Sequence, residues 1–289
     1  MIKDITKYKK YSNTEIGGLW KKKQFKKNNK SNPLISIITI TLNSQKFLKF
    51  TLDSIFNQKY KNYELIIIDG GSKDKTLKII KQNEKRIDFW LSEKDKGIYD
   101  AFNKGMELAR GELIGFVNSD DILNNDALYT LVKYHKKFPQ MDFFFGSVKK
   151  HWGILHGYNR WKIYYTWNFY SGHSLGFFIK KNAAKKIGKY NLEYKYHADW
   201  DYMYRMIVHH NMKGVATKKN EVFGNFRRGG FSSKIDFWEH FKETILIRKN
   251  NGQQKLIIFL ISIIKYFYNK NRLKQKNLIS IIFKKIFFE

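Results

Sequence analysis

The first half of the chain alternates between two hydrophobic patterns. Continuous apolar runs rich in β-branched residues are typical of strands buried on both faces, whereas apolar residues at every third or fourth position indicate helices. These patterns predict strands at 33–43, 63–71, 86–92 and 112–118, and helices at 44–58, 73–83 and 97–109. The alternation predicts an α/β fold with a mostly parallel, doubly wound sheet, which binds ligands beyond the carboxyl ends of its strands.

The second half of the chain is less regular. Helices are predicted at 124–138, 180–188, 199–211 and 234–250, with a strand at 141–149. Residues 151–170 are rich in Trp and Tyr without clear periodicity, so we interpret them as a loop or small insertion that lines a site. The pattern places one domain at 33–250, between a basic leader at 1–32 and a tail at 251–289.

The tail contains two short apolar runs separated by basic residues, and the longer run extends from Leu256 to Ile264. A helix that spans a bilayer needs about 20 mostly apolar residues, so neither run is long enough alone. We expect a basic amphipathic helix on the anionic inner face of the cell membrane, which would make the protein cytoplasmic and peripheral. The alternative is a helical pair that docks on the domain or on a second copy of the chain, giving a homo-oligomer.

Composition adds a charge asymmetry and excludes some chemistry. Lys and Arg number 55 against 25 acidic residues, a net charge of +30, and half of this excess lies in residues 1–30 and 253–289. An anionic surface would therefore meet the two ends first. The absence of cysteine excludes disulfides and thiolate chemistry, and the N-terminus lacks the pattern of a secretory signal.

Acidic residues occur at three places where a predicted strand ends or a helix begins. These are Asp69, the pair Asp120 and Asp121, and Asp199. Each place has an ordinary alternative role in helix capping, including Ser119 or the neighbouring aspartates for the helix that follows them. Two adjacent carboxylates are costly to bury unless a cation or hydrogen-bond donors compensate, so the pair also indicates a metal site.

The motifs that hold these residues resemble, in order and spacing, those of the family 2 inverting glycosyltransferases. The similar segments are SIITITLN, ELIIIDGGSKDKT, SEKDKGIYDAFNKGMELARGELIGFVNSDD and HADWD, within about residues 33–230. The similarity is greatest to the bacterial polysaccharide-assembly branch. It implies the GT-A fold and transfer of a sugar from a nucleotide-diphosphate donor to a lipid-linked or surface-polysaccharide acceptor.

The resemblance also implies which residues surround the nucleotide. Thr41 and Asn43 would border it, and Asp69 would accept a hydrogen bond from the base, which favours uracil and a UDP-sugar. Gly70 stands where many relatives have a second acid, so this position does not decide the base. The alternative for Gly70 is simply a turn before the next helix.

The same resemblance assigns the remaining aspartates to the reaction centre. Asp120 would contact ribose or donor sugar, and Asp121 would bind Mn2+ or Mg2+, hard cations that prefer carboxylate and phosphate oxygens. Asp199 matches the catalytic base, which removes the hydroxyl proton of the acceptor. Asp201 is the rival, because side chains two residues apart on a helix point about 200° apart and only one can face the site.

Several further polar residues are candidates by the same resemblance. Asp95 and Asn103 would contact the nucleotide or the donor sugar. His173 lies where relatives often have a His-Gln pair near the acceptor, with Ser174 here in place of Gln. Apart from the resemblance, Arg227 and Arg228 beside a Gly pair would clamp phosphates once a loop closes. The alternatives are a structural histidine and ordinary surface arginines.

Other classes of protein fit parts of the sequence. A nucleic-acid-binding protein would explain the basic flanks and their aromatic residues, but it would not explain acidic strand ends, so we do not expect a nucleic-acid partner. A catalytically silent relative that acts as a subunit of a complex is another alternative. A sugar-phosphate nucleotidyltransferase would normally carry a glycine-rich loop near the first strand, and TLNSQKF has none. We therefore expect a metal-dependent inverting glycosyltransferase.

Overall fold

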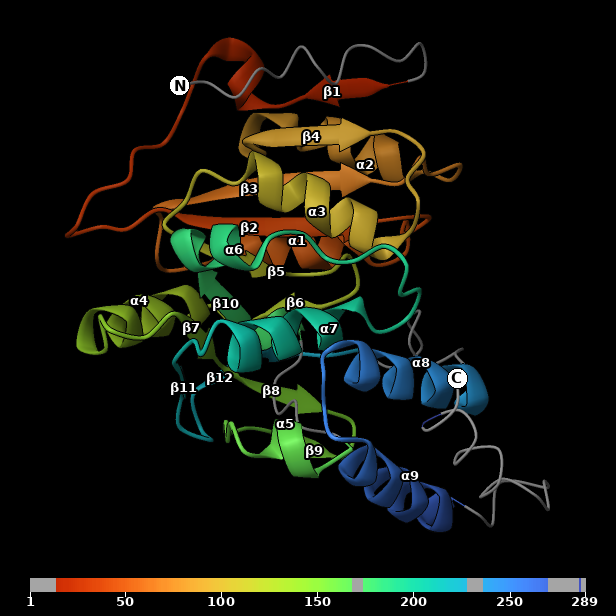
Figure 1. Ribbon diagram of the computed structural model, residues 1–289. Coiled ribbons are helices and arrows are strands. Elements are labelled where there is room, and N and C mark those ends of the chain that lie inside the picture. Colours follow the sequence, from red (N-terminus) through yellow and green to blue (C-terminus); the bar gives the residue numbers. More distant parts are fainter. Residues whose placement is uncertain (1–13, 168–173, 228–235, 270–285, 287–289) are drawn as a thin grey trace.

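The computed structural model describes residues 14–167, 174–227 and 236–269 and residue 286, and its centre is an eight-stranded sheet (Figure 1). The strands lie in the order β1-β4-β3-β2-β5-β10-β7-β11. Their bounds are β1 Glu15–Gly17, β4 Phe89–Ser92, β3 Tyr63–Asp69, β2 Ile35–Thr41, β5 Leu113–Phe116, β10 Phe177–Lys180, β7 Phe143–Phe145 and β11 Gly214–Ala216.

The four strands predicted in the first half form the parallel core of this sheet. β2 pairs in parallel with β3 and β5, and β3 pairs in parallel with β4. In this register Thr41 lies opposite Asp69, and Asp69 lies opposite Ser92, so three strands end together at one edge. The sheet becomes mixed at its flanks, because β1 and β10 pair antiparallel with their neighbours. The sequence pattern did not predict β10.

Helices cover both faces of the sheet, as the doubly wound prediction requires (Figure 1). One face packs against α3, α6 and α7, and the other against α1, α2 and α4. Their bounds are α3 Ile98–Leu108, α6 Lys181–Ile187, α7 Ala198–Tyr204, α1 Leu48–Phe56, α2 Thr76–Gln82 and α4 Ala127–Lys137. Alternate residues of β2 enter the two cores: Ile38 and Ile40 face the first, and Ile35 and Ile37 face the second. Burial on both faces explains the continuous apolar runs of the parallel strands.

A second, four-stranded sheet has the order β6-β12-β8-β9. It consists of β6 Ile122–Leu123, β12 Val222–Asn225, β8 Ser147–Lys150 and β9 Gly153–Leu155, and α5 Lys162–Tyr165 follows it. The single strand predicted at 141–149 is therefore wrong, because the chain passes from β7 in the main sheet to β8 in the second at Gly146. A Cβ atom at Gly146 would lie 2.1 Å from the ring of Phe223, so only glycine fits at this crossing.

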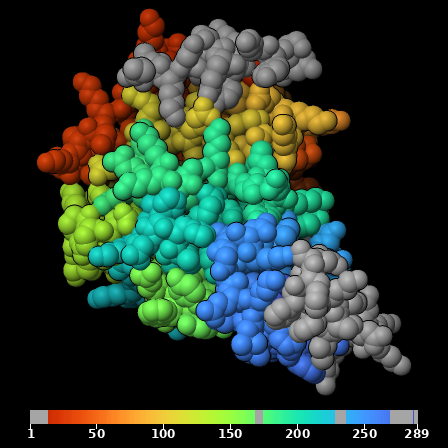
Figure 2. All heavy atoms as spheres, in the orientation of Figure 1, coloured from red at the N-terminus to blue at the C-terminus, as the bar shows by residue number. Residues whose placement is uncertain are grey.

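Both ends of the described chain pack on the domain. β1 pairs with β4, and the buried Trp20 stacks on Phe89 with ring centroids 5.3 Å apart. At the other end α8 Phe237–Asn250 and α9 Lys255–Asn269 confirm the predicted C-terminal helices. They form one corner of the molecule (blue in Figure 2). The guanidinium of the buried Arg248 donates 2.8 Å to the carbonyl of Ile163, which ties α8 to α5.

The remaining elements are short helices of other types. They are 3-10 helices at Leu19–Lys22, Glu84–Arg86 and Ser174–Gly176, and a π-helix at Arg205–His209 that continues α7. Among the helices within the described ranges, none combines the length and the apolar character needed to span a bilayer.

Candidate active site

Asp69 organises the two loops at the carboxyl edge of the sheet. Its side chain is fully buried, and its carboxylate accepts hydrogen bonds from the hydroxyl and the backbone N–H of Ser72 and from the hydroxyl of Ser92, the last at 2.6 Å. Ser72 belongs to the loop after β3, and Ser92 ends β4. The sequence motifs predicted Asp69 but not these two serines, although Ser72 lies in the DGGS segment.

Thr41 and Asn43 join the end of β2 to the loop after β3. The Thr41 carbonyl accepts the N–H of Gly70 at 2.9 Å. Asn43 has a left-handed backbone, with φ of 50°, and its side-chain oxygen accepts the N–H of Lys73 at 2.9 Å. The Thr41 hydroxyl is buried and has no hydrogen-bond partner among the described residues. These contacts give the loop after β3 a fixed position next to the strand ends.

The side chain of Asp95 fills the space next to the Cα atom of Gly70. A Cβ atom on Gly70 would lie 2.5 Å from Oδ2 of Asp95, so the carboxylate stands where a side chain at position 70 would begin. Its Oδ1 accepts the N–H of Gly97 at 2.9 Å, just before α3. Burial raises the pKa of Asp95, and the charges of Asp100 and Asp69 add to this. A carboxylate from the loop after β4 thus occupies the space that a side chain at position 70 would enter.

Asn103 links α3 to the segment before α7. Its side-chain amide donates 2.9 Å to the carbonyl of Tyr190 and accepts the N–H of the same residue at 2.8 Å. The side chain is buried. This pair of bonds gives Asn103 a structural role, and its contact with a donor stays a prediction.

The loop after β5 carries the paired aspartates and docks on β2 and α1. The backbone N–H of Ser119 donates to the carbonyl of Ile40, and the hydroxyls of Ser119 and Ser44 lie 2.7 Å apart. The Thr51 hydroxyl donates 2.8 Å to the carbonyl of Asp121. Since α4 begins only at Ala127, this loop lies too far upstream to cap it. The capping alternative for the aspartate pair is therefore wrong.

Asp121 is a buried carboxylate whose oxygens lack hydrogen-bond partners among the described residues. Only 1% of it is exposed, and in the part of the chain that the structure describes neither carboxylate oxygen accepts a hydrogen bond. Burial and the charge of Asp120 raise the pKa of Asp121 well above its usual range. Nearby backbone amides and the ammonium of Lys150 act in the opposite direction. Such a group is costly unless a cation joins it.

Two basic side chains approach the aspartate pair. The guanidinium of Arg227 lies 3.2 Å from the ring centre of Phe47, and its charge opposes the rise that burial causes in the pKa of Asp120. The ammonium of Lys150, at the end of β8, lies 4.7 Å from the ring centre of Phe226. Sequence reasoning missed Lys150, which no motif marks. Two predicted residues, His173 and Arg228, lie outside the described residues.

Asp199 lies in the first turn of α7, where His197 rather than Asp199 holds the N-cap position. Its Oδ1 accepts a 2.9 Å hydrogen bond from the hydroxyl of Tyr99 on α3 and a 3.1 Å bond from the N–H of Trp200. Burial raises the pKa of Asp199, while the charge of His197 and the bond from Tyr99 act to lower it. A raised pKa suits a carboxylate that must collect a proton.

Asp201, the alternative candidate for the base, forms hydrogen bonds with other residues. Its carboxylate accepts 2.8 Å from Nε of Arg205 and 3.0 Å from the amide of Asn251. The side chain is buried. The two aspartates of HADWD therefore have different partners, and Asp201 fastens α7 to the end of α8.

Glu243 of α8 holds the segment that precedes Asp199. Its carboxylate accepts the backbone N–H groups of Lys195 and Tyr196, at 2.6 and 2.9 Å, and lies 2.9 Å from Nδ1 of His197. These partners outweigh burial and lower the pKa of Glu243. Sequence reasoning missed this residue, because a glutamate on an amphipathic helix carries no distinguishing signal.

A continuous series of contacts joins the acidic positions. Asn43 bonds the loop after β3, where Asp69 ends the strand, and the adjacent Ser44 meets Ser119 beside the aspartate pair. On the other side Asp95 bonds the start of α3, and Tyr99 of the same helix reaches Asp199. Acidic residues from four separate segments are therefore linked around the carboxyl edge of the parallel core.

Comparison with known proteins identifies the family of this chain. The model of Glycosyl transferase family 2 matches residues 36–193, more than half of the chain. A PGL/p-HBAD biosynthesis glycosyltransferase of Mycobacterium bovis (strain BCG / Pasteur 1173P2) is 32% identical over 217 residues, which cover 70% of this chain and 80% of that protein. An uncharacterized glycosyltransferase of Haemophilus influenzae is 41% identical over 99 residues, or 33% of this chain and 40% of that protein.

Solved structures show the same fold at low sequence identity. Residues 1–349 of S. aureus TarS in complex with UDP-GlcNAc superpose with a TM-score of 0.65 at 18% identity, covering 87% of this chain and 79% of that one. The mannosyltransferase PcManGT from Pyrobaculum calidifontis, in complex with GDP-Man and Mn2+, gives a TM-score of 0.58 at 14% identity over 92% and 79% of the two chains. The predicted GT-A fold is confirmed. The chain belongs to glycosyl transferase family 2.

Proposed function

We propose that this glycosyltransferase moves a sugar, with inversion, from a nucleoside-diphosphate sugar to a hydroxyl of a glycan acceptor. Two carboxylates near the carboxyl edge of the parallel core support the proposal. The oxygens of Asp121, in the loop after β5, lack hydrogen-bond partners among the described residues, and Asp199 on α7 accepts a bond from Tyr99 while burial raises its pKa. Inversion needs one carboxylate that removes the acceptor proton as the new bond forms. UDP is the favoured carrier by family resemblance, and the TarS structure contains UDP-GlcNAc.

Asp121 fits a hard divalent cation, Mn2+ or Mg2+. Its two buried oxygens lack hydrogen-bond partners in the described chain, and such cations prefer carboxylate oxygens. Across the described residues no three His, Cys, Asp or Glu side chains form a metal-binding group. This donor set suits a cation held by one or two carboxylates, with substrate phosphates and water completing the shell. When bound, the cation would neutralise charge on the departing diphosphate.

A thermal-shift panel tests the donor and the metal together. We expect UDP with Mn2+ to raise the melting temperature more than GDP, ADP or dTDP with Mn2+, and more than UDP alone. A ligand at 100 times its Kd stabilises the folded state by about 2.7 kcal/mol, which amounts to several degrees. Failure of every nucleotide to shift the transition, together with salt-dependent RNA binding, would favour the nucleic-acid alternative.

We also propose that α9 contacts the membrane and brings the enzyme to a lipid-linked acceptor. Four large apolar residues recur along one side of this helix with at least half of each side chain exposed, namely Leu256, Leu260, Ile264 and Phe267. On the opposite side of α9, Ile258 and Ile261 belong to a buried hydrophobic cluster that includes Phe241 and Ile245 of α8. The basic excess of residues 253–289 suits an anionic leaflet.

Flotation with vesicles of phosphatidylglycerol and phosphatidylcholine tests this membrane contact. Replacing Leu260 and Ile264 together with Asp should reduce the bound fraction at least tenfold, because burying a large aliphatic side chain contributes about 1.5–3 kcal/mol. Tyr129→Asp is the matched control, since Tyr129 is an exposed apolar residue on α4. Unchanged flotation of the double variant, or a change in oligomeric state instead, would contradict the proposal.

A further inference from the structure

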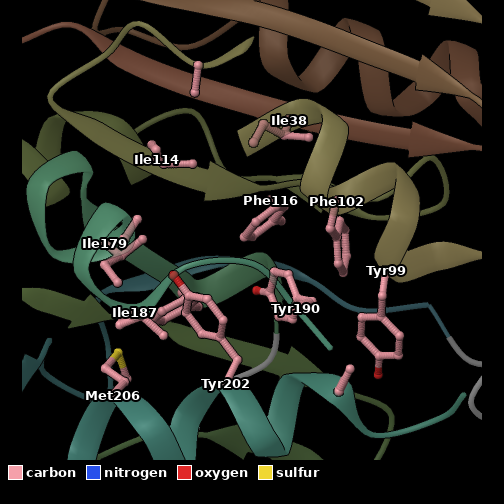
Figure 3. Close-up of a cluster of buried hydrophobic side chains, with 14 of the residues drawn as sticks. Ile38, Tyr99, Phe102, Ile114, Phe116, Ile179, Ile187, Tyr190, Tyr202 and Met206 are labelled. Carbon is pink, nitrogen blue, oxygen red and sulfur yellow. The ribbon is translucent and has the colours of Figure 1, made fainter. Parts of the chain in front are cut away.

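The hydroxyl of Tyr99 is held at a fixed point between α3 and α7. Its ring is buried, stacked on Tyr190 at 5.7 Å between centroids and edge-on to Phe102 at 6.2 Å. Figure 3 shows Tyr99 projecting from α3 toward the start of α7, with both neighbours beside it. The hydroxyl oxygen lies 2.9 Å from Oδ1 of Asp199 and 2.7 Å from the carbonyl oxygen of Tyr196. A rigid aromatic ring therefore sets the position of this hydroxyl.

The Tyr99 hydroxyl can donate its single hydrogen to only one of its two oxygen neighbours at a time. The phenol has one hydrogen and faces two oxygens, and the carbonyl of Tyr196 can only accept. When Asp199 is ionised, the phenol hydrogen points to its carboxylate. When Asp199 carries a proton, the carboxyl can donate to the phenol oxygen, while the phenol hydrogen turns to the carbonyl of Tyr196. Burial and the charge of Asp199 raise the pKa of Tyr99 well above its usual range, so the phenol keeps its own proton.

We propose that Tyr99 is a positioning residue that orients the Asp199 carboxylate toward the acceptor and satisfies it both before and after it takes up a proton. The inference rests on the proposed function, in which Asp199 is the base. In the transfer step the acceptor oxygen bonds to the anomeric carbon, the bond from that carbon to the diphosphate breaks, and the acceptor proton moves to Asp199. Rotation of the Tyr99 hydroxyl then accommodates the proton on Asp199 without movement of the surrounding side chains.

Other ionisable groups surround this pair. His197 lies beside Asp199 on the same segment, and Tyr190 faces Tyr99. From α8, Glu243 bonds His197, and His240 lies against His197 with ring centroids 4.1 Å apart. Lys265 of α9 acts on His240. Tyr99→Phe leaves all of these groups in place, so a changed pH profile in that variant reports the lost hydroxyl.

The test is the pH dependence of kcat in Tyr99→Phe, which keeps the ring and its packing. The lost bond favoured ionised Asp199, so its pKa should rise, and the acidic limb of the profile should move to higher pH by about one unit. Near neutral pH kcat should fall about tenfold, while the KM for the donor stays within about twofold. An acidic limb that does not move would overturn the inference.

Tyr202→Phe is the matched control. The Tyr202 hydroxyl is buried in the same core, on α7, and has no hydrogen-bond partner among the described residues. This variant should keep the wild-type pH profile, and an equal shift in both variants would contradict a specific role for Tyr99. Asp199→Asn distinguishes a failure of the proposed function from a failure of this inference. If Asp199→Asn transfers sugar, the assignment of Asp199 as the base is wrong. If Asp199→Asn is inactive but the acidic limb of the pH profile does not move in Tyr99→Phe, only the inference about Tyr99 is wrong.

Discussion

Asp199→Asn is expected to abolish sugar transfer while leaving donor binding intact. The amide has the same shape and its oxygen can still accept the bond from Tyr99, so the fold around α7 should survive. It cannot take up the acceptor proton. General-base assistance typically contributes about a hundredfold to ten-thousandfold in rate, and we expect a loss in this range. Transfer rates with saturating donor, measured beside the nucleotide-induced thermal shift, separate catalysis from binding.

Asp201→Asn provides the matched control for that experiment. Its carboxylate bonds Arg205 and Asn251, so its loss should lower the free energy of unfolding by about 1–3 kcal/mol through weakened attachment of α7. Turnover of the folded fraction should remain close to that of the wild type. The assignment of the base would be reversed if Asp199→Asn transferred sugar normally and Asp201→Asn did not.

Wild-type activity should also depend on pH in a defined direction. Asp199 acts as a base only when ionised, and burial raises its pKa. Activity is therefore expected to be lost as pH falls through that raised value, at a higher pH than the ordinary pKa of Asp, about 3.9, would give.

The elements with strong local patterns were predictable from the sequence. β2 and β3 are buried along their whole length, and the unbroken apolar runs followed directly from that burial. Elements set by distant contacts were not predictable. The crossing at Gly146 depends on Phe223, which is far away in sequence, and β10 is only four residues long, with a correspondingly short apolar run.

Some residues of the candidate site were likewise predictable from the sequence and others were not. Acidic residues at the ends of apolar strands were visible in the sequence, because a carboxylate that follows a buried strand breaks the local pattern. Their partners were not visible. Tyr99 reads as an ordinary core aromatic until the fold brings it to Asp199, 100 positions along the chain. The close approach of Asp95 to Gly70 likewise depends on two loops meeting in space.

Asp121→Asn is expected to produce two effects of opposite sign. Without metal, burial and Asp120 hold the pKa of Asp121 above its unfolded value. A group with a raised pKa favours the folded state at low pH, and this contribution is lost as pH rises from about 4 through the raised value. The Asn variant lacks this loss, so at neutral pH its metal-free melting temperature should exceed that of the wild type.

The second effect is the loss of the metal response. Mn2+ should raise the melting temperature of the wild type with UDP, and it should not do so in Asp121→Asn, because the amide is a poorer ligand than a carboxylate for a hard cation. Turnover should fall about a thousandfold, equivalent to about 4 kcal/mol of lost charge stabilisation. Asp126→Asn is the control, since Asp126 is exposed and pairs with Lys59. If Asp121→Asn had a higher metal-free melting temperature but an unchanged Mn2+ response, burial would destabilise the Asp121 carboxylate without making it the metal ligand. The metal ligand would then have to be another group at this edge of the sheet.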